Sequence, residues 1–182
     1  MYVHISLAIF DRDQQVKLLD LMQQAKQSGV ITVFDSNYRA NLWQDTQHAQ
    51  DIIRQAWQHT CMALPSWQDE KNIFDYQSKE DCIKQLLQWG VTDIAMSCAQ
   101  EPVILATQQS QQEIPITPIT DIIDTTAAGD SFNAGYMMAR ILDEKPAKAV
   151  QYGINLASKV IQHHGALIDN EHIPSWQELQ HD

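Results

Sequence analysis

Strand-like and helix-like segments alternate along almost the whole chain of 182 residues. Apolar runs typical of strands occur at residues 2–9, 30–34, 61–64, 93–97 and 103–107, and helical patterns occur at residues 13–28, 46–58, 78–89, 129–142 and 146–163. The run VITVF does not alternate apolar with polar side chains, which is typical of a strand covered on both faces of a parallel sheet. The alternation predicts an α/β fold: a doubly wound, mostly parallel sheet with helices on both faces, forming one domain over residues 1–182.

Several local signals support these boundaries. Gly29 and Gly90 follow helical patterns, as helix-ending glycines do. Ser78 and Asp81 have the spacing of a helix-capping pair, and Pro146 suits the first turn of the last long helix. The segment EIPITPI contains two prolines, so we expect an extended segment at a sheet edge.

Composition and charge exclude several classes of protein. The chain has 12 basic and 23 acidic residues, a net charge of -11, which disfavours nucleic-acid binding. No apolar segment is long enough to span a bilayer. Cys61, Cys82 and Cys98 form no CxxC pair, which favours a reducing cytoplasmic location over a disulfide scaffold or a zinc site. The pair His163 and His164 lacks spaced ligand partners, so we interpret it as partly exposed rather than metal-binding.

The segment DTTAAGDS, residues 124–131, carries the strongest chemical signal. It leads into a helical pattern, and the first N–H groups of a helix have no intrahelical partner and carry the positive end of its dipole. Residues 127–129 have almost no side chain, so a bulky anion can approach those N–H groups. Asp130 then lies where a carboxylate can accept a proton from a neighbouring hydroxyl, although it can equally cap its own helix. A base, a hydroxyl and an anion cradle are the parts of phosphoryl transfer to an alcohol.

The segment DTTAAGDSFNAG resembles the carboxyl-terminal signature of the ribokinase-like (pfkB) carbohydrate kinases. FDSNYRANLW at residues 34–43, together with ISLAI near the start, resembles the 2-keto-3-deoxygluconate kinase branch of that family. The resemblance extends from about residue 2 to about residue 174. The first third or more of the family, with its early Gly-rich sugar-binding motif and the strands of its lid, has no counterpart in this sequence.

The resemblance implies roles for the residues of the first motif. Asp130 matches the catalytic base, which also contacts the sugar hydroxyl, and Ala127, Ala128 and Gly129 match the anion hole that holds the transferred phosphoryl group. Ala128 and Gly129 would therefore also contact the nucleotide.

Asp124 and Thr126 match positions that help to hold a monovalent cation such as K⁺, with the backbone carbonyls of Gly165 and Ala166 as further ligands. The alternative for Asp124 and Thr126 is ordinary turn chemistry, in which both side chains bond nearby N–H groups.

The resemblance also assigns four residues outside that motif. Arg39 matches the arginine that contacts the substrate carboxylate, and Asn37 would line the nucleotide or phosphate side. Both can instead belong to a solvated loop. Glu70 aligns with a glutamate that acts near magnesium, although an acid in the first turn of a helix also simply suits the dipole. Asn155 lies on the helix that the family packs beside the adenine.

The segment AMSCAQEP, residues 95–102, departs from the family pattern. Relatives have a basic, Gly-rich turn bordering the nucleotide there, whereas Ser97 and Cys98 occupy this position in the present chain. Because glycines permit positive φ and close backbone approach, their loss predicts a weakened ATP site.

Three functional hypotheses follow. The first is ATP-dependent and magnesium-dependent phosphorylation of the 6-hydroxyl of 2-keto-3-deoxygluconate or a related sugar acid. The second is a non-catalytic or split kinase remnant that binds a partner chain, or a second copy, through an exposed sheet edge. The third is a different α/β enzyme that uses Asp130 without ATP, but the sequence has no Gly-x-Ser-x-Gly elbow for a hydrolase.

Overall fold

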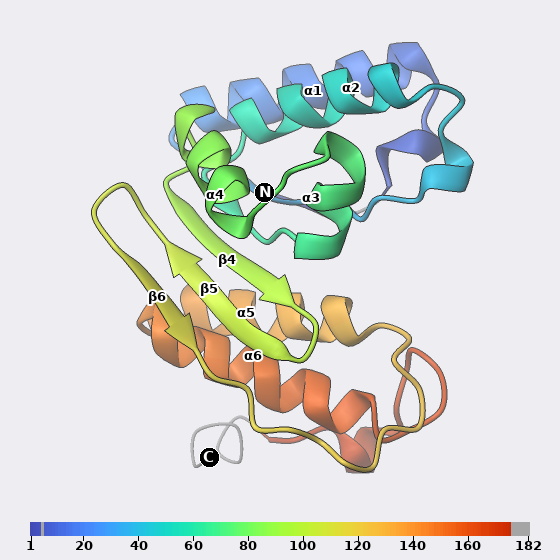
Figure 1. Cartoon of the computed structure of the whole chain (residues 1–182), viewed down its shortest axis with the longest axis vertical. Coiled ribbons are helices and arrows are strands. Elements are labelled where there is room, and N and C mark those ends of the chain that lie inside the picture. The colour runs from blue at the N-terminus through green and yellow to red at the C-terminus, as the bar shows by residue number, and fades with distance from the viewer. Residues whose placement is uncertain (5, 176–182) are drawn as a thin grey trace. The chain divides into compact units, whose positions relative to one another are not determined.

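The computed structural model describes residues 1–4 and 6–175 of the chain, and Figure 1 labels the α-helices and strands β4 to β6. The strands are β1 (Tyr2–His4), β2 (Val33–Asp35), β3 (Met62–Ala63), β4 (Asp93–Cys98), β5 (Glu101–Ala106) and β6 (Gln111–Ile114). The α-helices are α1 (Arg12–Gln27), α2 (Thr46–Gln58), α3 (Trp67–Phe74), α4 (Lys79–Gln88), α5 (Ala128–Ile141) and α6 (Pro146–Val160). Short 3₁₀ helices are η1 (Leu7–Ile9), η2 (Ala40–Leu42) and η3 (Asn170–His172). Within this part of the chain, no helix combines the length and the apolar character needed to cross a membrane.

Two compact units make up the structure. Unit 1 comprises residues 1–99 and 104–112, and unit 2 comprises residues 100–103 and the chain from Glu113 onward. Unit 1 therefore contains β1 to β4 and α1 to α4, whereas unit 2 contains α5 and α6.

The sheet has the strand order β1-β2-β3-β4-β5-β6. Strands β1 to β4 pair in parallel, with Val3 opposite Phe34 and Met62 opposite Asp93. Strands β4 and β5 are joined by only two residues, a connection that antiparallel neighbours alone can have. Strand β6 ends the sheet just before Pro115, which has no N–H to donate. The predicted mostly parallel sheet is thus confirmed, whereas only Glu113 and Ile114 of the predicted edge segment belong to the edge strand and both of its prolines lie beyond it.

Unit 1 has a single apolar core between its sheet and its helices. Helices α1 and α2, α2 and α3, and α3 and α4 are in contact, so the four helices form a continuous series. Phe34 of β2 meets Trp57 of α2 edge to face, with ring centroids 4.6 Å apart, and both side chains are fully buried. The helices therefore cover the sheet with the apolar faces that their periodicity predicts.

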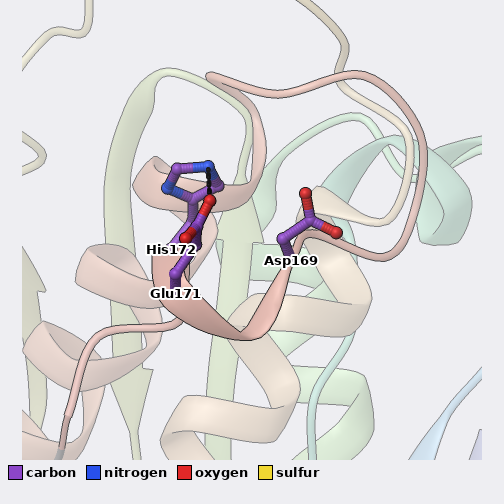
Figure 2. Close-up of side chains that lie close together, drawn as sticks. All are labelled: Asp169, Glu171 and His172. Carbon is purple, nitrogen blue, oxygen red and sulfur yellow. Dashed lines mark ion pairs between the residues drawn. The ribbon is translucent and has the colours of Figure 1, made fainter.

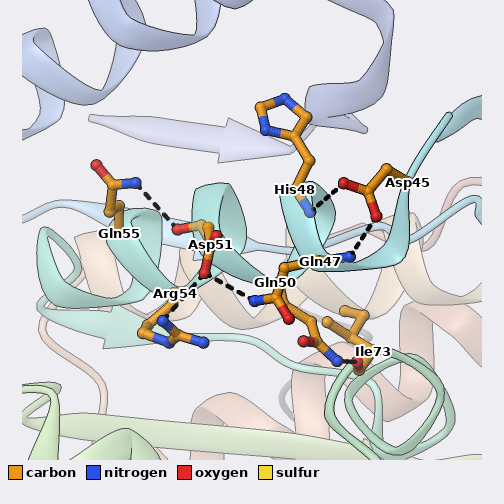
Figure 3. Close-up of polar contacts among 8 residues, drawn as sticks. All are labelled: Asp45, Gln47, His48, Gln50, Asp51, Arg54, Gln55 and Ile73. Carbon is orange, nitrogen blue, oxygen red and sulfur yellow. Dashed lines mark hydrogen bonds and ion pairs between the residues drawn. The ribbon is translucent and has the colours of Figure 1, made fainter.

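Side-chain caps begin three helices of unit 1. Asp11 and Gln14 form a complete capping box at the start of α1. Asp45 accepts the N–H groups of Gln47 at 3.0 Å and His48 at 3.3 Å at the start of α2 (Figure 3). The Ser78 hydroxyl accepts the N–H of Asp81 at 3.1 Å, as the spacing of the two residues predicts. These polar residues satisfy N–H groups that a helix cannot satisfy itself, so the helix starts are encoded locally.

The prediction of one long strand over residues 2–9 is wrong. Strand β1 ends at His4, and Leu7–Ile9 form the 3₁₀ helix η1. Leu7 is buried in the core, and its carbonyl accepts a hydrogen bond of 2.9 Å from Gln15 Nε2 of α1. This contact with α1 is a tertiary effect that an apolar run alone does not show.

The ammonium group of Lys26 joins three helices of unit 1. Its Nζ donates to the carbonyl oxygens of Gln58 at 3.0 Å, Thr60 at 2.9 Å and Gly90 at 3.2 Å. These carbonyls lie at or just beyond the carboxyl ends of α2 and α4, where helix carbonyls lack partners and the dipole is negative. One cation from the end of α1 thus neutralises two other helix ends.

Replacing this lysine should destabilise unit 1. We expect Lys26→Met to lower the free energy of unfolding by about 2 kcal/mol, because charge-assisted hydrogen bonds to three carbonyls are lost. Lys17→Met, on an exposed position of the same helix, is the matched control and should change it by less than about 0.5 kcal/mol. Urea unfolding followed by circular dichroism measures both, and equal stability of the two variants would contradict the role of Lys26.

Helices α5 and α6 of unit 2 pack against each other through two glycines. A Cβ on Gly135 would lie 2.7 Å from the Tyr152 carbonyl oxygen, and a Cβ on Gly153 would lie 2.7 Å from the Phe132 carbonyl oxygen and side chain. Phe132, Tyr136 and Tyr152 are buried around this crossing. The absence of side chains at both positions permits the close backbone approach.

Adding one methyl group at this crossing should be costly. We expect Gly135→Ala to reduce stability by about 1–3 kcal/mol through overpacking, despite the better helix propensity of alanine. In Gly129→Ala the new Cβ meets no atom within 4 Å, so this control should be neutral or stabilising in the same thermal unfolding experiment. A stabilised Gly135→Ala variant would show that the two helices can separate without penalty.

Candidate functional site

The turn before α5 is held by the carboxylate of Asp124. Its Oδ1 accepts the N–H of Thr126 at 2.8 Å, and its Oδ2 accepts the N–H of Gly165 at 2.9 Å. The Thr126 hydroxyl and these two N–H groups lower the pKa of Asp124 to about 2. The N–H groups of Ile123 and Asp124 also both donate to the Ile161 carbonyl. The turn is therefore tied to the segment that follows α6, and Asp124 stays ionised at neutral pH.

This arrangement brings Asp124, Thr126 and Gly165 together, three of the four residues predicted to hold a monovalent cation. Ala166 is the next residue after Gly165. The charged carboxylate, hydroxyl and carbonyl oxygens are ligands that hard cations prefer, so the donor set fits. Both Asp124 oxygens also accept N–H groups, which means that the alternative of ordinary turn chemistry is at least part of its role. Cation binding itself stays a prediction.

Helix α5 begins in an unusual backbone conformation. Ala127, its N-cap residue, has φ 61° in the left-handed region, and its side chain makes no cap hydrogen bond. The N–H of Ala128 donates to the Thr125 carbonyl at 3.2 Å, so one predicted anion-hole donor already has a partner. Gly129 is exposed, with no atom within 4 Å of the place a Cβ would take. The backbone at Gly129 is thus open to approach.

Asp130 lies in the first turn of α5 and is exposed. It shares this turn with Gly129, while the next three residues, Ser131, Phe132 and Asn133, are buried. The helix therefore buries its far side and presents Asp130 to solvent. A carboxylate in this position can accept a proton from a hydroxyl beside the open helix start.

The turn after β2 carries Asn37 and Arg39. Asp35, buried at the end of β2, accepts the N–H of Asn37 at 2.9 Å, and Asn37 has φ 37°. The Tyr38 side chain enters the core, whereas Arg39 is exposed and donates from Nη1 to the Tyr38 carbonyl at 3.2 Å. The guanidinium thus lies at the surface, on a turn whose backbone is held by the hydrogen bond to Asp35 and by the buried Tyr38 side chain. Its remaining donors suit a carboxylate, and the carboxylate-binding role stays a prediction.

Two acids of α3 approach this turn. Asp69 Oδ2 accepts the N–H of Tyr38 at 3.3 Å. The pKa of Asp69 is raised, mainly by burial and then by the nearby Asp35 carboxylate, while the Tyr38 N–H and the Arg39 guanidinium oppose this shift. No motif in the sequence points to a role for Asp69. The only available signal was an acid in the first turn of a helix, and helix dipoles favour such acids everywhere.

Glu70 is wholly buried inside unit 1. Its Oε2 accepts a hydrogen bond of 3.2 Å from Trp57 Nε1, and its Oε1 has no hydrogen-bond partner of good geometry among the described residues. Burial raises the pKa of Glu70 to about 8; the nearby Ser36 hydroxyl and Trp57 N–H oppose the shift, and the carboxylates of Asp35 and Asp69 add to it. In this arrangement Glu70 presents no oxygen to solvent, which does not fit direct contact with magnesium, and its metal role stays a prediction.

The last residues of β4 are packed against other parts of unit 1. Cys98 is buried and Ser97 is half-buried, with its N–H bonded to the Pro65 carbonyl at 2.9 Å. Ala99 then takes φ 56°, a left-handed conformation that costs a residue with a Cβ roughly 1–2 kcal/mol. A nucleotide role for Ser97 and Cys98 stays a prediction, although Cys98 points into the core and offers a ligand no side-chain surface.

Asn155 lies half-buried on α6. Its Oδ1 accepts from Gln151 Nε2 at 2.9 Å, whereas its Nδ2 is buried without a partner among the described residues. Its predicted contact with adenine remains untested.

One group of side chains has the composition of a metal site. Asp169, Glu171 and His172 have ligand atoms within 4.8 Å of one another, and all three are exposed (Figure 2). His172 Nε2 lies 3.6 Å from Glu171 Oε1, and the His172 ring lies 4.5 Å from the ring of His163. Neither His163 nor His164 belongs to this group.

The buried carboxyl of Glu70 should make stability depend on pH. Its pKa of about 8 in the folded state is far above the ordinary value of 4.5, so the native state binds the proton more tightly than the unfolded state. This contribution to stability is full below about pH 4.5 and is lost as the pH rises through 8, with a slope of at most ~1.4 kcal/mol per pH unit. Glu70→Gln should remove this slope, as measured by urea unfolding between pH 5 and 8.

Glu80→Gln is the control for this experiment, because Glu80 is an exposed acid in the first turn of α4. The wild-type slope should persist in this variant. A Glu70→Gln variant with an unchanged slope would show that Glu70 does not carry the effect.

Known proteins match both the sequence and the fold. Relatives with related sequences include 2-dehydro-3-deoxygluconokinase from Haemophilus influenzae, 34% identical over 91% of this chain and 53% of that protein. The enzyme of the same name from Escherichia coli K12 is 33% identical over 94% of this chain and 56% of that protein. The chain thus spans about half the length of the curated relatives it matches.

Comparison with solved structures identifies the fold of the chain. A fructokinase from Vibrio cholerae O395, a double mutant with fructose, ADP and potassium ion bound, has a TM-score of 0.84 at 20% identity. The match covers 98% of this chain and 58% of that structure. The fold is therefore the α/β fold of ribokinase-like sugar kinases, as predicted. The family described as pfkB family carbohydrate kinase matches residues 1–173, so the chain belongs to this family.

Proposed function

We propose that the chain carries the phosphoryl-transfer part of a sugar-acid kinase, which moves the terminal phosphoryl group of ATP to the 6-hydroxyl of 2-keto-3-deoxygluconate or a related sugar acid. The observation that carries this proposal is the start of α5, where exposed Asp130 follows an open Gly129. Four curated relatives named 2-dehydro-3-deoxygluconokinase, 30–34% identical to this chain, support the choice of substrate. Such a substrate has both a hydroxyl for a base and a carboxylate for a guanidinium.

The residues divide the chemistry between them. Asp130 accepts the proton of the attacking hydroxyl, which makes the oxygen a better nucleophile as the bond to phosphorus forms. The backbone at Ala127, Ala128 and Gly129 holds the transferred group, whose charge the dipole of α5 stabilises. Arg39 holds the sugar carboxylate with two parallel N–H donors. Magnesium, when bound to the phosphates, neutralises charge that develops on their oxygens.

Further parts of the proposal rest on individual groups. The ionised Asp124 and the Thr126 hydroxyl would hold K⁺ near the anion-binding turn, so that the cation and the start of α5 act on the same negative charge. Asn37, Ser97 and Asn155 would line the nucleotide side. We also propose that residues 1–182 form one domain, because a single family model matches residues 1–173. The three free cysteines fit a cytoplasmic location.

Removing the base should abolish transfer. We expect Asp130→Asn to lower kcat by about 10²–10⁴-fold, because general-base assistance has this magnitude, with little change in binding of the sugar acid. Asp121→Asn, an exposed acid of the same loop, should keep wild-type turnover. A coupled assay of ADP release with 2-keto-3-deoxygluconate measures both variants, and a wild-type chain that gives no turnover, or Asp130→Asn with full turnover, would refute the proposal.

A second candidate function is a non-catalytic one, in which the chain binds a partner chain or a second copy. It is favoured by the end of β4, where Cys98 is buried rather than lining an open Gly-rich turn, and by Ala99 after it, which is in a left-handed conformation. Strand β1, at the end of the sheet order, would supply the edge for pairing. Light scattering after gel filtration, combined with calorimetric titration of ATP and magnesium, distinguishes the non-catalytic function from the kinase function. An oligomer that binds no nucleotide favours the non-catalytic function. A monomer that turns over substrate excludes it.

A further inference from the structure

The turn that carries Asn37 and Arg39 is fixed by carboxylates from two different elements. The N–H of Asn37 donates to Asp35 of β2 at 2.9 Å, and the N–H of the next residue, Tyr38, donates to Asp69 of α3 at 3.3 Å. Two consecutive amides are thus bound by two acids. The contact from Asp35 is local, whereas the contact from Asp69 joins residues 31 positions apart.

Asp69 can act as a fixed point because α3 is itself anchored on both sides of it. Ser66, the N-cap residue, forms an isolated parallel bridge with Ser97, whose N–H donates to the Pro65 carbonyl at 2.9 Å. On the other side, Glu70 is fully buried and bonded to Trp57. The first turn of α3 is therefore attached to β4 and α2, and Asp69 projects from it to the turn after β2.

The negative charge of Asp69 also attracts the Arg39 guanidinium. The Arg39 guanidinium is exposed, is attached to the backbone through the Tyr38 carbonyl, and attracts the Asp69 carboxylate. Without a nearby anion, a long arginine side chain on a surface turn samples many rotamers, and ordering it on binding costs free energy. The hydrogen bond from the Tyr38 N–H to Asp69 holds the backbone of the turn before a ligand arrives, and attraction to the Asp69 carboxylate favours positions of the guanidinium close to it.

We propose that Asp69 is a positioning residue, which holds the Asn37–Arg39 turn so that Arg39 faces the carboxylate of a sugar acid. This inference rests on the proposed function for the identity of the ligand. The attachment of the turn to Asp69 does not depend on the ligand. Ligand titration and a measurement on the free protein therefore test the two parts separately.

The test uses the full chain and three variants. Asp69→Ala removes both the hydrogen-bond acceptor and the charge, and Asp69→Asn keeps an oxygen for the Tyr38 N–H but removes the charge. Glu80→Gln removes an equivalent exposed first-turn acid from α4 and is the matched control. Circular dichroism and urea unfolding establish that each variant is folded.

Hydrogen exchange of the Tyr38 amide, followed by NMR, is the measurement on the free protein. We expect exchange to be about tenfold faster in Asp69→Ala, the factor that corresponds to ~1.4 kcal/mol. Asp69→Asn should restore most of the protection, and Glu80→Gln should match the wild type. Unchanged exchange in Asp69→Ala would overturn the proposal, whatever the result with ligands.

Calorimetric titration with 2-keto-3-deoxygluconate, and separately with ATP and magnesium, is the ligand measurement. In Asp69→Ala we expect the dissociation constant of the sugar acid to rise about tenfold, with a partial recovery in Asp69→Asn, while that of the nucleotide stays within about twofold in both variants. A general loss of structure would weaken both ligands, and an unchanged affinity for the sugar acid would overturn the proposal. If the wild type binds no sugar acid, the proposed function fails, and the Tyr38 exchange still decides whether Asp69 holds the turn.

Discussion

Parallel pairing of β1 to β4 is the constraint on which the candidate groups of unit 1 depend. It brings the carboxyl ends of the strands to one edge of the sheet, where Ser97 lies at the end of β4 and where the segments that follow β2 and β3 carry Arg39 and Asp69. These three segments are cross-connected by the bridge between Ser66 and Ser97 and by the hydrogen bond from Tyr38 to Asp69. The polar groups at the carboxyl ends of these strands are thus connected to one another.

The same edge contains an unfavourable concentration of negative charge. Asp35 and Glu70 are buried there, and Asp69 is partly buried, in a chain whose net charge is already -11. Burial of several ionised carboxylates side by side is costly, and proteins commonly respond by keeping one of them protonated. Glu70 shows this behaviour: its pKa is raised mainly by its own burial and further by the carboxylates of Asp35 and Asp69, while Trp57 donates to the carboxyl group. Neutral Glu70 permits the packing of α3 on α2 that sets the place of Asp69.

In unit 2, neighbouring elements support the exposed start of helix α5. Close packing of α5 on α6 at Gly135 and Gly153 buries the far side of α5, and Asp124 ties the preceding turn to Gly165. Asp130 and Gly129 therefore project from a supported element rather than a free loop. The left-handed φ of Ala127 places backbone strain at this point, as is common where a structure is organised for binding.

Much of the architecture follows from local patterns in the sequence. The helix over residues 46–58, the capping by Ser78 and the small-residue start of α5 were predictable because apolar periodicity, caps and helix breakers act over a few neighbouring residues. The motif of residues 124–135 also identified the family, which the match over residues 1–173 confirms. The single-domain prediction and the roles of the individual site residues stay predictions.

Tertiary structure alone decided the features that depend on contacts between distant segments. The apolar run of residues 2–9 contains no signal that Gln15 will hold the Leu7 carbonyl or that β1 will end at His4. Two adjacent acids of α3 likewise look alike in sequence, yet Glu70 turns inward to Trp57 while Asp69 turns to the Tyr38 amide. The physical reason is that desolvation and hydrogen bonding depend on what each side chain meets after the strands have paired, and no local pattern specifies those partners.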